Sequence, residues 1–150
     1  MKLSKRLKAI SDLIPNDSKV IDVGADHALL DIYLNKYKNC SCLATDISPY
    51  CTEKAKENAI KYQANIETLT NDGLTGLNLN DEIIVISGMG TKNIIKILNF
   101  NIHNDLIISS HTNIEDLKEF LLNKNYKIEK EISVNDKKDY TIIYAKSQEV

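Results

Sequence analysis

The chain has 150 residues, of which 43% are hydrophobic and 27% are charged, with five glycines and two prolines. At this length, roughly 68 to 70% of the extended surface is removed from water on folding, so one ordinary hydrophobic core can stabilise the chain. The formal net charge of −2 neither requires nor excludes a nucleic-acid partner, so any basic surface that binds one must be local.

Membrane insertion and secretion are not expected from the sequence. No stretch approaches the ~18 apolar residues of a membrane span, and the N-terminus is amphipathic instead of resembling a signal peptide. The three cysteines lie within residues 40–51 without a histidine at zinc-ligand spacing, which favours packed thiols in a reducing compartment and no bound metal. We expect one cytoplasmic domain over residues 1–150, with a monomer favoured.

The chain begins with a predicted helix over residues 3–14, because apolar residues recur at helical spacing until Pro15. Short apolar runs rich in β-branched residues then alternate with helical patterns. The predicted strands are residues 20–23, 42–45, 66–69, 83–86 and 106–108, and their length and composition suit strands buried on both faces. The predicted helices between and after them are residues 27–37, 49–62, 91–98 and 113–123.

Two further runs, residues 126–134 and 140–145, alternate apolar and polar side chains around a turn at 135–138. This pattern indicates an antiparallel hairpin at the end of the chain. The whole order predicts an α/β fold with a leading helix and a doubly wound, mostly parallel sheet that ends in the hairpin. Such sheets bind ligands beyond the carboxyl ends of their strands.

The loop after the first strand indicates which cofactor such a sheet binds. A dinucleotide site requires the pattern G-x-G-x-x-G, but after Gly24 the second and third glycine positions hold Asp26 and Leu29. A carboxylate beside a pyrophosphate would be repelled, which disfavours NAD and FAD. S-adenosylmethionine carries no phosphate and has a cationic sulfonium, so an acidic loop is compatible with it.

Acidic residues and glycines also follow the later strands. Asp46, 22 residues after Gly24, stands where an acid accepts hydrogen bonds from both ribose hydroxyls. Asp72 is placed to bond an adenine amino group, with Gly73 forming a turn. Each motif has an alternative interpretation, because residues 46–49 are typical of a helix cap and residues 71–73 of a turn. Three acids at successive strand ends favour the cofactor interpretation.

At this point the sequence resembles the bacterial tRNA (adenine-22-N1) methyltransferases, a family with the Rossmann-like class I S-adenosylmethionine-dependent fold. The resemblance rests on KLSKRL at residues 2–7 with IP at 14–15, DVGADHA at 22–28, DGL at 72–74 and SGMG at 87–90. It implies methylation of N1 of adenine, at position 22 of tRNA, with S-adenosylmethionine as cofactor and tRNA as partner.

The resemblance also implies roles for individual residues. Asp26 is the expected catalytic residue, although it is also suited to capping the following helix. The cofactor-binding residues expected with it are Asp22, Gly24, Asp26, His27, Asp46, Ile47, Asp72, Gly73, Gly88 and Met89. The expected substrate-binding residues are Arg6, His27, Met89, Gly90, Ser110 and His111.

Two departures from the family leave alternatives open. Members commonly have a Q-P-N-like segment after the fifth strand, where this chain has Ser109-Ser110-His111. They also continue into a helical C-terminal extension that helps to hold tRNA, which we expect to be absent because the chain ends at Val150. The alternatives are a class I methyltransferase acting on another RNA position or substrate, and a non-catalytic module that binds S-adenosylmethionine.

Overall fold

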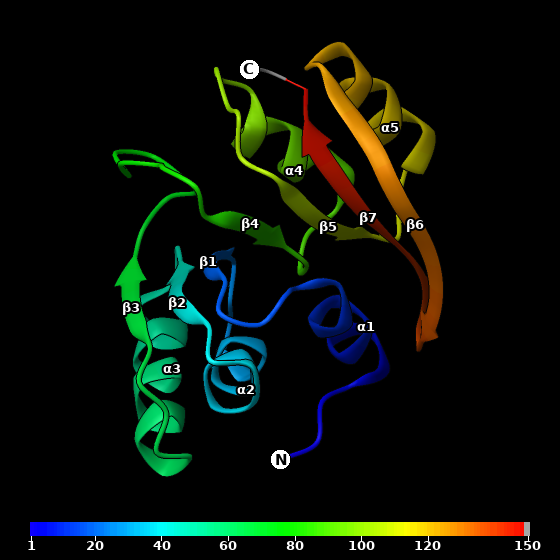
Figure 1. Cartoon of the computed structure of the whole chain (residues 1–150). Coiled ribbons are helices and arrows are strands. Elements are labelled where there is room, and N and C mark those ends of the chain that lie inside the picture. The colour runs from blue at the N-terminus through cyan, green and yellow to red at the C-terminus, as the bar shows by residue number, and fades with distance from the viewer. Residues whose placement is uncertain (149–150) are drawn as a thin grey trace.

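The computed structural model describes residues 1–148 and shows one seven-stranded sheet with helices on both faces (Figure 1). The elements in chain order are α1 (Lys5–Leu13), β1 (Lys19–Val23), α2 (Leu29–Lys38), β2 (Ser41–Asp46), α3 (Pro49–Lys61), β3 (Glu67–Thr70), β4 (Ile83–Ile86), α4 (Thr91–Leu98), β5 (Leu106–Ser110), α5 (Ile114–Asn123), β6 (Tyr126–Asp136) and β7 (Lys138–Ser147). None of the helices in this described part is long and apolar enough to cross a bilayer.

The strand order is β3-β2-β1-β4-β5-β7-β6. Strands β1 to β5 pair in parallel, whereas β7 lies antiparallel between β5 and β6. The predicted doubly wound sheet with a closing hairpin is therefore confirmed. The chain leaves β1 toward β2 on one side and later returns to β4 on the other, which opens a crevice at the carboxyl end of β1.

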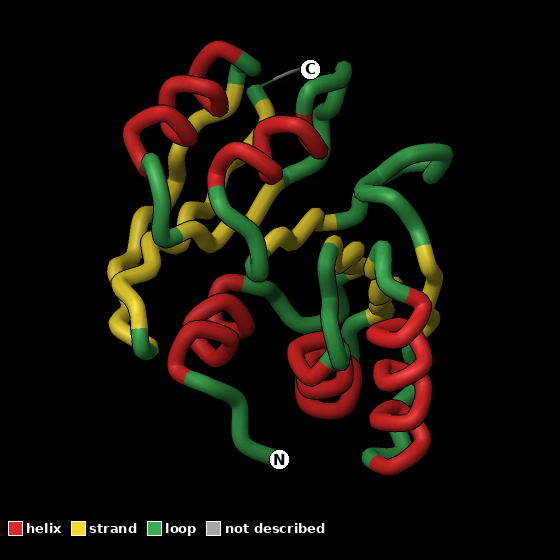
Figure 2. Tube along the Cα trace, turned by 180° about the vertical axis from the view of Figure 1, so that it is seen from behind, coloured by secondary structure: helices red, strands yellow, loops and turns green. Residues whose placement is uncertain are grey.

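Alternating side chains divide the core into two layers. Ile21, Ile84 and Ile108 face α4 and α5, whose buried residues belong to the same apolar cluster. Their sequence neighbours, such as Val20 and Val85, face α1 and α2 on the other side. Figure 2 shows these helices on opposite sides of the sheet from behind. The period-2 alternation thus lets each central strand bury both faces, as expected.

Helix α2, the hairpin strands and strand β3 differ from the sequence predictions for physical reasons. Helix α2 begins at Leu29 because Asp26 and Ala28 have φ values of 54° and 62°, which interrupt helical geometry before it. The hairpin strands meet at a tight turn on Lys137, so both are longer than predicted. Strand β3 is an edge strand with mostly exposed residues, so the expectation that it is buried on both faces is wrong.

The hairpin reaches back to the start of the chain. Near its turn, the carboxylate of Asp136 accepts a hydrogen bond of 3.2 Å from the backbone N–H of Arg6, and α1 packs on both β6 and β7. This contact brings residues from the two ends of the chain to the crevice at the end of β1.

Candidate functional site

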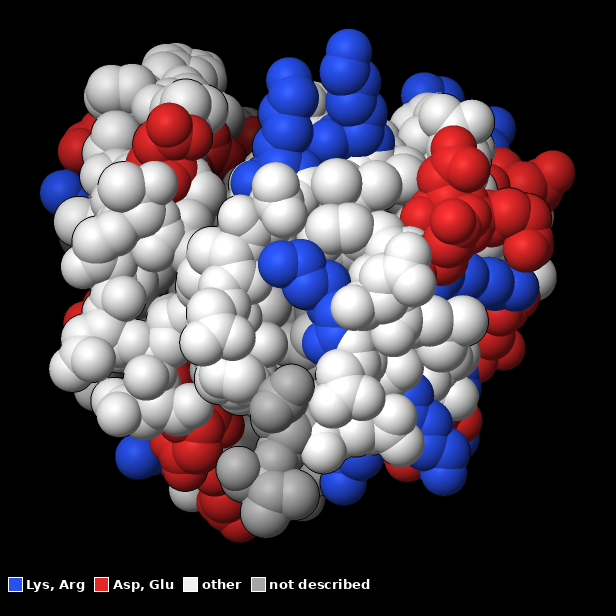
Figure 3. Space-filling model, turned by 90° about the horizontal axis from the view of Figure 1, so that it is seen from above, with Lys and Arg blue, Asp and Glu red and all other residues white. Residues whose placement is uncertain are grey.

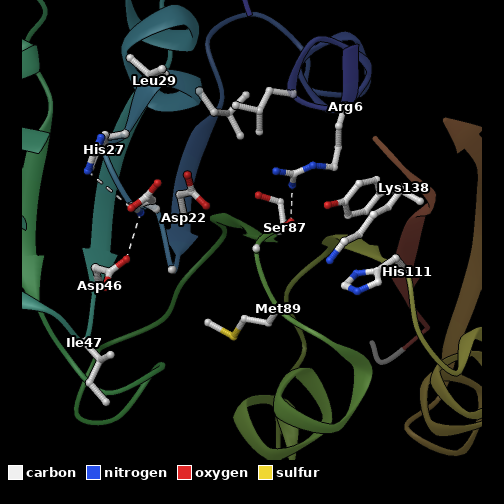
Figure 4. A pocket seen from close by; sticks show the side chains of 18 residues that line it. Arg6, Asp22, His27, Leu29, Asp46, Ile47, Ser87, Met89, His111 and Lys138 are labelled. Carbon is white, nitrogen blue, oxygen red and sulfur yellow. Dashed lines mark hydrogen bonds and ion pairs between the residues drawn. The ribbon is translucent and has the colours of Figure 1, made fainter. Parts of the chain in front are cut away.

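A cavity of about 580 Å³ opens at the carboxyl ends of β1, β2 and β4, which is within the usual size range of small-molecule sites (Figure 4). It lies where the strand order reverses, as the fold predicts. Its lining residues are Arg6, Leu7, Asp22, Gly24, Ala25, Asp26, His27, Ala28, Leu29, Leu30, Asp46, Ile47, Ser87, Gly88, Met89, His111, Lys138 and Tyr140.

The floor of the cavity is kept open by Gly24. Its φ is +73°, and a Cβ at this position would lie 2.7 Å from the terminal methyl group of Met89. The next residue, Ala25, donates its N–H to the carbonyl of Thr45 at 2.8 Å, which ties the loop to β2. Glycine is required here by both the backbone conformation and the close approach of Met89.

Asp46 is held in place at one end of the cavity. One carboxylate oxygen accepts the N–H of Asp26 and the other accepts the N–H of Ser48, each at 3.0 Å. The helix cap is Ser48, whose hydroxyl accepts the N–H of Cys51, so the capping interpretation applies to Ser48. A carboxylate has about four acceptor positions, so Asp46 retains capacity for hydroxyl donors in the cavity.

Asp26 projects from the loop without capping a helix. The N-cap of α2 is Ala28, and no side chain caps that helix, so the capping alternative for Asp26 is wrong. Its carboxylate lies 3.7 Å from Nε2 of His27 and accepts the thiol of Cys51 at 3.3 Å. Cys51 is therefore a half-exposed neighbour of the cavity, unlike the buried Cys40 and Cys42, and the expectation that it only packs is wrong.

The potential ligand atoms of Asp26, His27 and Cys51 lie within 4.8 Å of one another. Asp26 is exposed and the other two are half-exposed. These three form the group among residues 1–148 whose geometry permits a metal ion. The absence of a metal stays a prediction.

Asp22 lies at the back of the cavity, between the Asp46 end and the Arg6 end (Figure 4). Its side chain is buried, and its Oδ1 atom has no hydrogen-bond partner among the described residues. Burial raises the pKa of Asp22 to about 6, and the nearby Arg6 guanidinium opposes this rise. An acid in this state accepts a cationic ligand group favourably.

The opposite end of the cavity is built from α1 and β7. Arg6 donates from Nη1 to the carbonyl of Ser87, and its guanidinium carbon lies 4.8 Å from the centre of the Tyr140 ring. The ring of His111 meets Tyr140 edge-on, with 5.5 Å between centroids. Arg6 is thus engaged by the protein, and its predicted role in substrate binding stays a prediction.

Sequence reasoning missed Tyr140 and Lys138, both of which line this end of the cavity. They follow the turn at Lys137 in a segment that was predicted only as a hairpin. Lys138 and Tyr140 are two residues apart, so the sequence places both on the same face of one strand. That pattern does not show that the hairpin packs against α1.

Four predicted site residues lie outside the cavity lining: Asp72, Gly73, Gly90 and Ser110. The turn interpretation of residues 71–73 is confirmed, because the side-chain amide of Asn71 donates to the carbonyl of Gly73 at 3.0 Å. Ser110 is fully buried, and its hydroxyl pairs with Thr91 and the N–H of Thr112, whereas its predicted contact with substrate stays a prediction. Gly90 is the N-cap of α4.

Charged side chains outside the cavity are mixed in sign. On the face seen from above, Lys and Arg side chains stand among groups of Asp and Glu (Figure 3). On α5, Lys118 lies 2.7 Å from Glu131 and 3.6 Å from Glu115, so its charge is already paired. Within the cavity, Arg6 and Lys138 are the lysine and arginine side chains of the lining.

The chain matches the family described as a methyltransferase domain over residues 3–143. A Mycoplasma genitalium protein named as a candidate tRNA methyltransferase is 32% identical over 143 residues, which cover 90% of this chain and 65% of the relative. The tRNA (adenine(22)-N(1))-methyltransferase of Bacillus subtilis strain 168 is 27% identical over 157 residues, covering 98% of this chain and 66% of the relative. The chain thus spans just under two thirds of the length of these relatives.

A solved structure extends the similarity to three dimensions. M. capricolum TrmK in complex with S-adenosyl-homocysteine superposes with a TM-score of 0.91 and 29% identity, covering 99% of this chain and 70% of that chain. The resemblance inferred from the sequence motifs is confirmed by these relatives. Since the family match extends over nearly the whole chain, the chain belongs to the methyltransferase domain family.

Proposed function

We propose that the chain transfers a methyl group from S-adenosylmethionine to N1 of adenine in tRNA, at position 22. The observation that carries this proposal is the cavity at the strand-order switch, whose lining includes Gly24 and the three acids Asp22, Asp26 and Asp46. The activity named for the B. subtilis relative and the ligand of the M. capricolum structure support it. A tRNA partner in turn favours a cytoplasmic location.

The residues of the cavity fit this cofactor. The unpartnered Oδ1 of Asp22 is suited to an ammonium group, and a side chain at position 24 would fill the space beside Met89. Asp46 has acceptor capacity for ribose hydroxyls. Three carboxylates would repel a pyrophosphate, so the same residues disfavour a dinucleotide.

When bound, S-adenosylmethionine supplies an electrophilic methyl group on a sulfonium. The chain must then position adenine N1 in line with that methyl group and exclude water. Because N1 lies on the Watson–Crick edge, a paired adenine has to leave its stack. In this proposal three residues of the cavity lining, His27, Met89 and His111, form the walls around the extruded base. In this proposal Asp26, which lines the cavity, accepts a hydrogen bond from the N6 amino group and stabilises the positive charge that develops on the base.

The test is methylation of a tRNA transcript that contains A22, with the product mapped by mass spectrometry. We expect one methyl group on A22 and none on a matched transcript with G22. Methylation at another position would support the alternative of a different RNA target. Cofactor binding without transfer to any tRNA would support the non-catalytic module.

The role of Asp26 is tested in the same assay. Asp26→Ala is expected to retain cofactor binding and to lose methyl transfer by 10²-fold or more, in the range of a lost transition-state contact. Asp116→Ala, which removes an exposed carboxylate on α5, is the matched control. Wild-type turnover by Asp26→Ala with bound cofactor would refute the catalytic role.

A further inference from the structure

The carboxyl groups of Asp22 and Asp31 are both buried. Asp22 on β1 is 2% exposed, and Asp31 in the first turn of α2 is 0% exposed. Oδ1 of Asp22 and both oxygens of Asp31 receive no hydrogen bond from an N–H or O–H group within residues 1–148. Neither acid takes part in any ion pair of this part of the chain.

Two adjacent buried anions would be strongly unfavourable, so the pair must retain a proton. Burial raises the pKa of both acids, and the Asp22 carboxylate raises the pKa of Asp31 further. The hydrogen bond from Asp31 acts in the opposite direction on Asp22 and lowers its pKa. These opposite directions agree with one proton that is shared between Asp31 and Asp22.

Only one member of the pair faces the cavity. Asp22 lines it, whereas Asp31 does not. The charged groups that act on Asp22 are Arg6 from α1, which favours its ionised form, and Asp46 from β2, which disfavours it. Behind the pair, Cys42 on β2 stays a neutral thiol, because its own burial and both acids raise its pKa.

We propose that Asp31 is the positioning residue of this cavity: its carboxyl proton is donated to Asp22 and holds that carboxylate, in the ionised form, toward the ammonium group of the ligand. The proposal deepens the proposed function and rests on it for the identity of the ligand. S-adenosylhomocysteine carries such an α-ammonium group on its amino-acid portion. Asp31 itself touches neither ligand nor substrate.

A pH dependence of ligand binding follows from this arrangement. With the pKa of Asp22 near 6, binding is strongest above that pH and weakens below it by up to about tenfold per pH unit, as Asp22 takes up a proton. Removal of the Asp31 donor leaves Asp22 buried but without the hydrogen bond that favours its ionised form. The loss of affinity then begins at a higher pH.

The experiment is a calorimetric titration of the full chain with S-adenosylhomocysteine from about pH 5 to pH 8. Asp31→Asn retains an N–H donor and is expected to keep the midpoint of the acid-side loss within about half a pH unit of wild type. Asp31→Leu removes the donor with a side chain that is also branched at Cγ, and it is expected to raise this midpoint by about one unit or more. The same midpoint in Asp31→Leu and wild type would overturn the proposal.

A second readout does not depend on ligand binding. Carboxyl ¹³C NMR of the ligand-free chain is expected to show Asp22 titrating near pH 6 while Asp31 stays protonated. Independent titration of both acids near pH 4 would overturn the shared proton, even if Asp31→Leu does not fold. A shared proton in a chain that binds no S-adenosylhomocysteine at any pH would refute the proposed function and the ligand-positioning role, and leave only a structural pair.

Discussion

Asp31 links the stability of the chain to pH. Its folded pKa is raised well above 3.8, first by burial and then by the Asp22 carboxylate. Between the unfolded and folded pKa values, the folded chain holds one proton that the unfolded chain has released. The contribution of Asp31 to the free energy of unfolding is thus fully present below about pH 4. It falls by about 1.4 kcal/mol for each pH unit above that, until the folded pKa is passed.

The substitution Asp31→Asn removes this titration and retains a donor toward Asp22. Its free energy of unfolding relative to wild type is therefore expected to increase as the pH rises above about 4, by up to about 1.4 kcal/mol per pH unit, until the raised folded pKa is passed. Urea unfolding followed by circular dichroism at pH 5, 6 and 7 measures this slope. Asp116→Asn, at an exposed position, should follow wild type. Parallel pH profiles for Asp31→Asn and wild type would show that Asp31 holds no proton in the folded chain.

Three further substitutions test the site and the core. Gly24→Ala places a Cβ on a residue with a φ of +73° and 2.7 Å from Met89, so we expect a loss of about 1 to 2 kcal/mol in the free energy of unfolding and a loss of most ligand affinity. Unchanged ligand binding would contradict the role of Gly24 in keeping the cavity floor open. Tyr140→Ala removes the ring under Arg6 and should lower kcat/KM for tRNA at least tenfold, while the affinity for the ligand stays within threefold of wild type. An unchanged kcat/KM would exclude Tyr140 from the end of the cavity that binds the substrate. Leu121→Ala deletes a fully buried side chain and should cost about 2 to 5 kcal/mol in urea unfolding, where a loss below 1 kcal/mol would show that the core is not packed as described.

The fold was predictable because its signals are local. Short β-branched runs became the central strands, and β4 and α4 have the predicted bounds. Gly24 and Asp46 were identifiable because they occupy strand ends on a parallel sheet, where position along the chain determines which edge a residue reaches.

The parts that were not predictable depend on contacts between distant segments. Tyr140 reaches the cavity only because the hairpin packs on α1, and no pattern within the hairpin encodes that contact. Ser110 adjoins the predicted site in sequence, but the extension of β5 to this residue turns its side chain into the core. Asp31 looks like an ordinary first-turn acid of a helix, and its interest arises from burial against Asp22.

The most direct test of the central claim is a titration of the purified chain with S-adenosylmethionine and, separately, with NADH. The cavity is expected to bind S-adenosylmethionine with one-to-one stoichiometry, to lose at least tenfold in affinity with Asp46→Ala, and to leave NADH unbound. Binding of NADH in preference to S-adenosylmethionine, or equal affinity in the Asp46→Ala variant, would contradict the account.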